Sequence, residues 1–151
     1  MGVALQSWLA WAALSAVFAA LTAIFAKLGV TDIPADVATF VRTLVILAML
    51  AAILVASGEW RLLGSALANQ GSLGRGFAFL LLSGLATGAS WLCYFRALKL
   101  GDAARVAPVD KLSVVLVAVF GVVFLGEHLT LPNWLGVALI AGGAILVAYK
   151  A

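Results

Sequence analysis

The sequence predicts an all-α protein, a polytopic membrane helical bundle with five transmembrane helices. Of its 151 residues, 66% are hydrophobic and only 10% are charged, and the mean hydropathy is +1.21. A water-soluble domain of this length needs far more polar residues to cover its surface. The apolar residues are also gathered into long runs, which short segments rich in glycine, proline and charge separate.

One domain covering residues 1–151 accommodates all of these runs. The longest connection is residues 58–74, between the second and third spans, and residues 60–68 within it are a candidate for a short interfacial helix. Before the second span, Asp32 is a candidate N-cap. Each run is close to the roughly 20 helical residues that cross the hydrocarbon of a bilayer. The expected spans are about 5–28, 33–57, 76–97, 103–126 and 131–149.

Two spans carry small residues at a spacing of four. Gly84 and Gly88 form a GxxxG pattern in the third span, and Ala138 and Gly142 form a similar pair in the fifth. Small side chains at this spacing let two helix backbones approach closely. These four positions are therefore predicted to be helix-packing residues.

Arg42 lies about two turns inside the second span, roughly 12 Å from its start. Its long side chain either extends to the headgroups or faces the interior of the bundle. We favour the inward orientation, because ionisable residues within membrane spans usually face protein or water. Trp91 and Tyr94 end the third span in an aromatic cluster next to Arg96, which is either an interfacial belt or a stacking surface for a substrate.

The fourth span brings Pro108, Asp110 and Lys111 into the bilayer, because the apolar run from Leu112 to Gly126 is too short to cross alone. Each charge costs about 2.5–3.5 kcal/mol at mid-depth. We therefore expect both charges to face protein or a water-filled cavity, with Pro108 as a helix kink that frees backbone carbonyls. Side chains at neighbouring helical positions point about 100° apart, so Asp110 and Lys111 need not pair with each other. A pair between Asp110 and Arg42 is the alternative.

Nothing in the sequence indicates an enzyme. Cys93 is the only cysteine and His128 the only histidine, so we predict no disulfide, no metal site and no cofactor. No nucleophile–base constellation or phosphate-binding loop is present. The net charge is +3, and the cations that produce it are scattered at span ends, where lipid headgroups account for them. We therefore expect no nucleic acid partner.

The odd number of spans puts the two termini on opposite sides of the membrane. Arg61 and Arg75 lie on the side of the N-terminus. Because positive charge is retained in the cytoplasm, we expect a multi-pass protein of the cell (inner) membrane with a cytoplasmic C-terminus. The cations on the C-terminal side are Lys27, Arg96, Lys99, Arg105 and Lys150.

Leu92–Ala148 resembles the EamA domain of the drug/metabolite transporter superfamily. The early arginine of the second span, Arg42, is also similar to the family pattern, whereas the Asp110–Lys111 pair is not general to it. A second proline that the family often has in the fourth helix is replaced here by the run at 113–115. Substrate preference is therefore not carried over. The matching motifs fall at Ala97–Gly101, Val106–Pro108, Gly126–Glu127, Leu129–Thr130 and Gly136.

The resemblance implies that this chain is half of an inverted-repeat transporter fold. Most family members carry two such domains in one chain, with the substrate cavity between them. A single domain is therefore expected to dimerise. We favour an antiparallel homodimer, which recreates the inverted repeat and requires dual topology. The five-to-two cation bias opposes dual topology, and a paired homologous subunit in one orientation is the alternative.

The expected function is a membrane transporter of a small metabolite or drug-like solute that works as a dimer by alternating access. In this interpretation Arg42 attracts an anionic group, Trp91 and Tyr94 stack on the substrate, and Asp110 and Lys111 line the cavity. Asp110 as a coupling-proton site is less favoured, because Lys111 stabilises the charged carboxylate. The alternative is a non-transporting membrane subunit that packs against a partner transporter and stabilises or regulates it.

Overall fold

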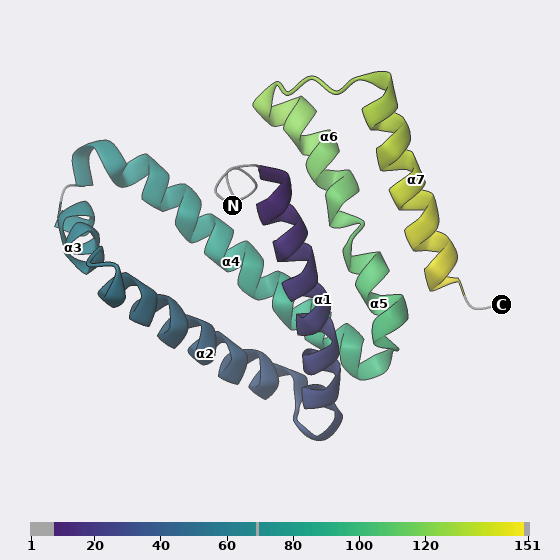
Figure 1. Ribbon diagram of the computed structural model, residues 1–151, viewed down its shortest axis with the longest axis horizontal. Helices are drawn as coiled ribbons and strands as arrows, with labels where there is room; N and C mark the ends of the chain where they lie inside the picture. The colour runs from purple at the N-terminus through teal and green to yellow at the C-terminus, as the bar shows by residue number, and fades with distance from the viewer. Residues whose placement is uncertain (1–7, 69, 150–151) are drawn as a thin grey trace. The chain divides into compact units, whose positions relative to one another are not determined.

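The structure, a computed structural model, describes residues 8–68 and 70–149, with the side chains of residues 66–75 left aside. All regular elements in this part of the chain are helices, which confirms the all-α prediction (Figure 1). The helices are α1 (Trp8–Asp32), α2 (Ala35–Ala56), α3 (Trp60–Ala68), α4 (Gln70–Leu100), α5 (Ala103–Asp110), α6 (Ser113–Leu125) and α7 (Leu131–Ala148).

Five stretches of the described chain are long and apolar enough to cross a membrane, as predicted. Trp8–Asp32 and Ala35–Ala56 supply the first two, and residues 5–7 of the expected first span lie outside the described residues. The short helix expected at residues 60–68 is also present, as α3, and its interfacial location stays a prediction. The remaining three spans are Gly76–Leu100, Ala103–Leu125 and Leu131–Ala148.

The first connection differs from the expectation. α1 continues to Asp32, so Asp32 ends a helix and does not cap the next one. Pro34 occupies the N-cap position of α2, which has no side-chain cap hydrogen bond. Ile33 precedes Pro34, and a residue before proline avoids the α conformation, so α1 stops before Ile33. Gly29 lies inside α1 and does not end it.

The second difference is at the start of α4, which begins at Gln70, inside the segment expected to be a loop. That segment contains several glycines, whose cost in a helix is only about 1 kcal/mol each relative to alanine. A cost of this size does not exclude a helix that continues into a long apolar span.

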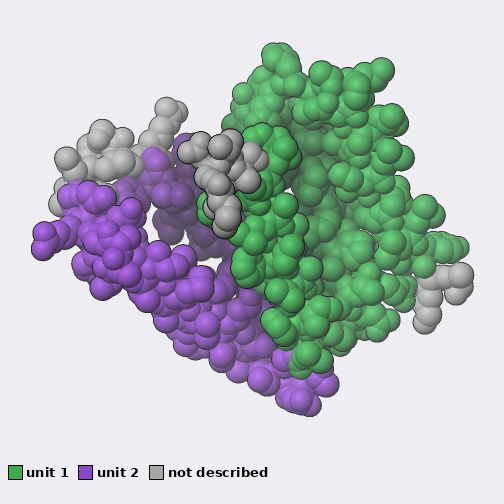
Figure 2. Space-filling model, viewed as in Figure 1, with its two compact units in different colours: residues 1–28, 97–151 green, residues 29–96 purple. Residues whose placement is uncertain are grey.

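The described chain divides into two compact units, which Figure 2 colours separately. The first contains residues 1–28 and 97–151, and the second contains residues 29–96. The second unit is a helical hairpin in which α4 runs back toward the start of α2 (Figure 1). Gly58, just after α2, has φ of +76°, a left-handed conformation that favours glycine.

In the first unit, α7 packs against both α5 and α6 (Figure 1). The packed face of α7 includes Val137, Ala141 and Ala144, and Ala144 is only 7% exposed. Ala138 and Gly142 are exposed on the same helix, as Gly84 and Gly88 are on α4. Packing at these four positions therefore stays a prediction for contacts with another chain. The four residues are Gly84, Gly88, Ala138 and Gly142.

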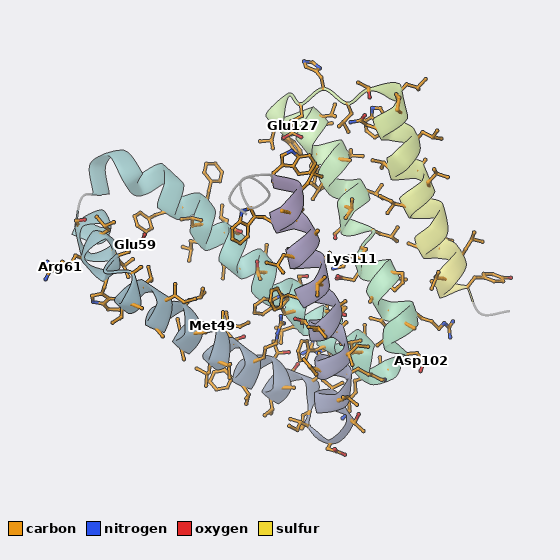
Figure 3. All side chains as sticks on the ribbon, in the orientation of Figure 1. Met49, Glu59, Arg61, Asp102, Lys111 and Glu127 are labelled. Atoms are coloured by element: carbon orange, nitrogen blue, oxygen red, sulfur yellow. The ribbon has the colours of Figure 1, made fainter. Side chains whose placement is uncertain are left out.

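The end of α6 explains the Gly126–Glu127 motif. Gly126 has φ of +69°, a left-handed conformation that favours glycine at a helix end, and the backbone N–H of Glu127 donates to the carbonyl of Gly121 at 3.1 Å. The Glu127 side chain folds back onto α6, where Figure 3 labels it. A Cβ at Gly121 would lie 2.6 Å from Glu127 Oε2, so the carboxylate occupies space that only a glycine at position 121 leaves open.

Candidate functional site

Arg42 of α2 lies over two aromatic rings of α4. Its guanidinium carbon is 4.1 Å from the centre of the Trp91 ring and 5.5 Å from that of Phe95. Both distances are within the range of a cation–π interaction. Trp91 and Phe95 are four residues apart, so they lie one turn apart on the same face of α4. We call Arg42, Trp91 and Phe95 the Arg42 site.

The aromatic contacts offset only part of the cost of placing arginine in a membrane span. A cation–π interaction is worth about 0.5–2 kcal/mol, whereas arginine at mid-depth costs about 2.5–3.5 kcal/mol. Stacking also leaves the guanidinium N–H donors unused. The ion pairs found among residues 8–68 and 70–149 do not include Arg42. The site therefore combines a positive charge with hydrogen-bond donors that the aromatic rings do not use.

Tyr94 supports this site from one side. Its ring meets that of Phe95 edge-on, with centroids 6.4 Å apart and an interplanar angle of 66°. Sequence analysis named Trp91 and Tyr94 as stacking residues and missed Phe95, which is only 2% exposed. The available signal was its spacing of four from Trp91, which places both rings on the face toward Arg42.

A second charged contact joins the same two helices. Arg96 Nη2 lies 3.0 Å from Asp36 Oδ1 and 3.1 Å from Asp36 Oδ2. The side chains are 58% and 60% exposed, and ion pairs this open contribute only about 0.2–1 kcal/mol. Sequence analysis counted Arg96 as a topology signal and missed the pair, because the register between α2 and α4 is not readable from either helix alone.

The other unit holds Asp110 and Lys111, where the structure interrupts the fourth span between α5 and α6 (Figure 3). Lys111 Nζ lies 3.2 Å from Asp110 Oδ2, so Asp110 pairs with its neighbour. That both of these residues line one cavity with Arg42 stays a prediction.

The interruption itself is a short stretch with tightened hydrogen bonds. The N–H of Leu112 donates to the carbonyl of Val109, and the N–H of Val114 donates to that of Lys111, both three residues back. Pro108 lies in α5 just before this stretch and cannot donate to the carbonyl of Ala104. A tightened turn in the middle of a span often marks a hinge.

Two cations that sequence analysis assigned only to topology bind helix ends within the first unit. Lys27 Nζ donates to the carbonyls of Leu98 and Gly101 at 2.7 and 2.8 Å, where α4 ends. Arg105 Nη2 donates to the carbonyl of Ala148 at 2.9 Å, the last residue of α7. Cations at these ends satisfy free carbonyls and complement the helix dipole.

The charged side chains of the described residues form separate small contacts. Within residues 8–68 and 70–149, no three His, Cys, Asp or Glu side chains gather as metal ligands would. The charged contacts inside the spans include a cation on an aromatic surface, an exposed arginine–carboxylate pair and a carboxylate–ammonium pair at a helix interruption. Five apolar spans indicate a multi-pass membrane protein, and charged groups inside such spans usually face protein or water.

Comparison with known proteins identifies the family. The chain matches the model of the EamA-like transporter family over residues 6–149. A protein of Sinorhizobium sp, named an uncharacterized transporter in the cobO 3′ region, is 64% identical over 143 residues, which are 95% of this chain and 97% of that protein. No solved structure matches. The chain therefore belongs to the EamA-like transporter family and is a membrane transporter, as the resemblance predicted.

Proposed function

We propose that this protein carries a small amphipathic anion across the cell (inner) membrane. The observation that supports this substrate class most strongly is the position of Arg42 over Trp91 and Phe95. One face of the Trp91 ring is already covered by the Arg42 cation, whose charge would repel a cationic solute. A carboxylate or phosphonate instead meets guanidinium donors that can bind it through two parallel hydrogen bonds.

The apolar part of such a substrate would lie against the aromatic residues beside the cation. Trp91 and Tyr94 are only half-buried within the chain, so their rings retain surface for contact. An organic acid with a small apolar group satisfies both the charge and this surface. A simple inorganic anion satisfies only the charge, and we expect it to bind more weakly.

The transport cycle that we propose is alternating access in a dimer. The family resemblance implies two five-helix domains around one cavity, and a single chain supplies one of them. Exposed small residues on α4 and α7 are suited to close contact with a second chain. We favour an antiparallel homodimer, and a paired homologous subunit remains the alternative. Asp110 and Lys111 would line the cavity beside the α5–α6 interruption, which would let the two half-helices move.

Transport in proteoliposomes tests this proposal with phenylphosphonate as the anionic probe and phenyltrimethylammonium as the matched cation. We expect saturable uptake of the anion alone. Arg42→Ala should reduce it at least about tenfold, because a charge-assisted hydrogen bond is worth about 1.5–3 kcal/mol. Asp110→Asn should also reduce it. Transport of the cation, or unchanged transport in both variants, would remove the proposed site.

Purification separates the carrier from the non-transporting subunit that its sequence also allows. The carrier should purify as a stable homodimer whose melting temperature rises with phenylphosphonate. A protein that is obtained only with a larger membrane partner, and whose melting temperature does not respond to the anion, would be a subunit.

A further inference from the structure

The α2–α4 hairpin carries a second arginine, Arg96, whose partner Asp36 lies nearer the start of α2 than Arg42 does. Asp36 is the second residue of α2, and Arg42 follows six residues later, so about 9 Å deeper along the helix. Arg96, the partner of Asp36, directly follows Phe95 of the Arg42 site in α4. The two cations thus bind across the same helix pair at two depths.

We propose that Arg96 is an outer anion-binding site of this transporter and that the Asp36 carboxylate occupies it as an internal stand-in for the substrate anion. The ligand class is a carboxylate or phosphonate, because Asp36 itself binds through both carboxylate oxygens, at 3.0 and 3.1 Å from Arg96 Nη2. The proposal rests on the proposed function in one respect, namely that the anion then continues to Arg42.

The pair has the properties of an exchangeable contact. More than half of each side chain is exposed, so a soluble anion can reach Arg96 without opening the fold. Exposed ion pairs also contribute little to stability. Asp36 lies in the first turn of α2, where the helix dipole stabilises a carboxylate even without a cation partner. The helix should therefore stay folded, and the carboxylate should stay stabilised, when Asp36 is released from Arg96.

The displaced Asp36 carboxylate favours movement of the bound anion from Arg96 toward Arg42. An anion bound at Arg96 lies next to the negative charge of Asp36, and like charges at short range repel. Arg42 lies farther along α2, and its guanidinium is 5.5 Å from the ring centre of Phe95, the residue just before Arg96. When the anion moves to Arg42, Asp36 pairs with Arg96 again behind it, which restores the contact seen in the structure.

Binding of phenylphosphonate to the purified protein in detergent, measured by calorimetry, tests the outer site. Asp36→Asn removes the internal competitor, so we expect the anion to bind about tenfold more tightly. The gain should disappear in the double variant Asp36→Asn/Arg96→Gln. Glu59→Gln and Arg61→Gln are matched controls in the same unit, and they should leave the affinity unchanged. If Asp36→Asn lowers the folded yield, Asp36→Ser serves the same purpose.

Several outcomes would overturn the outer site. These are an affinity that Asp36→Asn leaves unchanged or weakens, a gain that survives in the double variant, and an absence of binding in every variant. The result for Arg42→Gln separates this inference from the proposed function. If that variant loses phosphonate transport while Asp36→Asn has no effect on binding, the inner site stands and the outer site is wrong. If Asp36→Asn tightens binding while Arg42→Gln transports normally, the outer site stands and the proposed function is wrong.

Discussion

Arg42 combines three properties that suit it to bind an anion. It lies inside a span, its charge rests on two aromatic rings, and its guanidinium is planar, so it can stack and bind an oxyanion at the same time. Lysine keeps the charge but offers a point ammonium in place of a forked set of donors.

Arg42→Lys should therefore weaken phenylphosphonate binding about tenfold and leave the protein folded in the membrane. The expected loss corresponds to one charge-assisted hydrogen bond, whereas Arg42→Gln should lose more because the charge is also removed. Isothermal calorimetry of the three proteins measures this order. Equal affinities for the lysine variant and the native protein would show that charge alone governs the site.

Lys27 acts on structure instead of on substrate. Its ammonium donates to the carbonyls of Leu98 and Gly101 and so ties α1 to the turn that ends α4. Lys27→Met keeps the apolar stem and leaves both carbonyls without this donor. Because hydrogen bonds to charged groups contribute about 1.5–3 kcal/mol, the melting temperature should fall by several degrees. Lys27→Arg should retain most of the stability, and an Arg61→Met control should not differ from the native protein.

The sequence supported the inward orientation of Arg42 through a general rule, since an ionisable group in a span usually faces protein. It could not supply the partners. Phe95 and Asp36 became visible only when the register between α2 and α4 was known, because that register depends on side chains of both helices together. Periodicity within one helix carries no information on which residue of another helix lies opposite.

At the scale of the elements, the interruption between α5 and α6 is the feature most directly related to motion. Pro108 was predicted to kink the fourth span, and the structure places the change at Lys111 and Leu112, just beyond the proline. The proline ring removes one backbone hydrogen bond of α5. Several hydrogen bonds after it join an N–H to the carbonyl three residues back instead of four. The exact position of such a break depends on packing against α7, which no local pattern encodes.

Pro108→Ala should restore the missing donor and favour one continuous helix, since proline costs about 3 kcal/mol relative to alanine inside a helix. If the interruption is a hinge, the turnover rate of phenylphosphonate transport should fall several-fold while the affinity at Arg42 stays constant. Pro132→Ala is the matched control, because proline at the start of α7 is already compatible with the helix. Native turnover in both variants would exclude a hinge at this position.

For the whole molecule, the number and the approximate bounds of the spans were predictable because long apolar runs leave few alternatives in a bilayer. Two helix bounds were not predictable, namely the start of α4 at Gln70 and the end of α1 at Asp32. Glycine is a weaker helix breaker than proline, so the glycines before the third span did not stop α4, whereas Pro34 follows directly after the end of α1. The organisation into one domain and the dimer remain predictions.

Mapping of both termini in intact cells tests the proposed assembly. An antiparallel homodimer requires each terminus to occur on both sides of the membrane, and reporter fusions at each end should then be active in both compartments. The bias of cations toward the C-terminal side favours a single orientation and works against this result. A single location for each terminus would exclude the antiparallel homodimer and leave a partner subunit as the alternative.

Binding of an organic anion at Arg42, beside its aromatic rings, is measured most directly by fluorescence. A variant that keeps Trp91 as its only tryptophan, with phenylalanine at positions 8, 11, 60 and 134, gives a fluorescence signal from the ring that Arg42 covers. Titration with phenylphosphonate should change that fluorescence saturably, phenyltrimethylammonium should not, and the change should vanish when Arg42→Gln is added. A saturable response that persists without the arginine, or one that appears with the cation, would contradict the account.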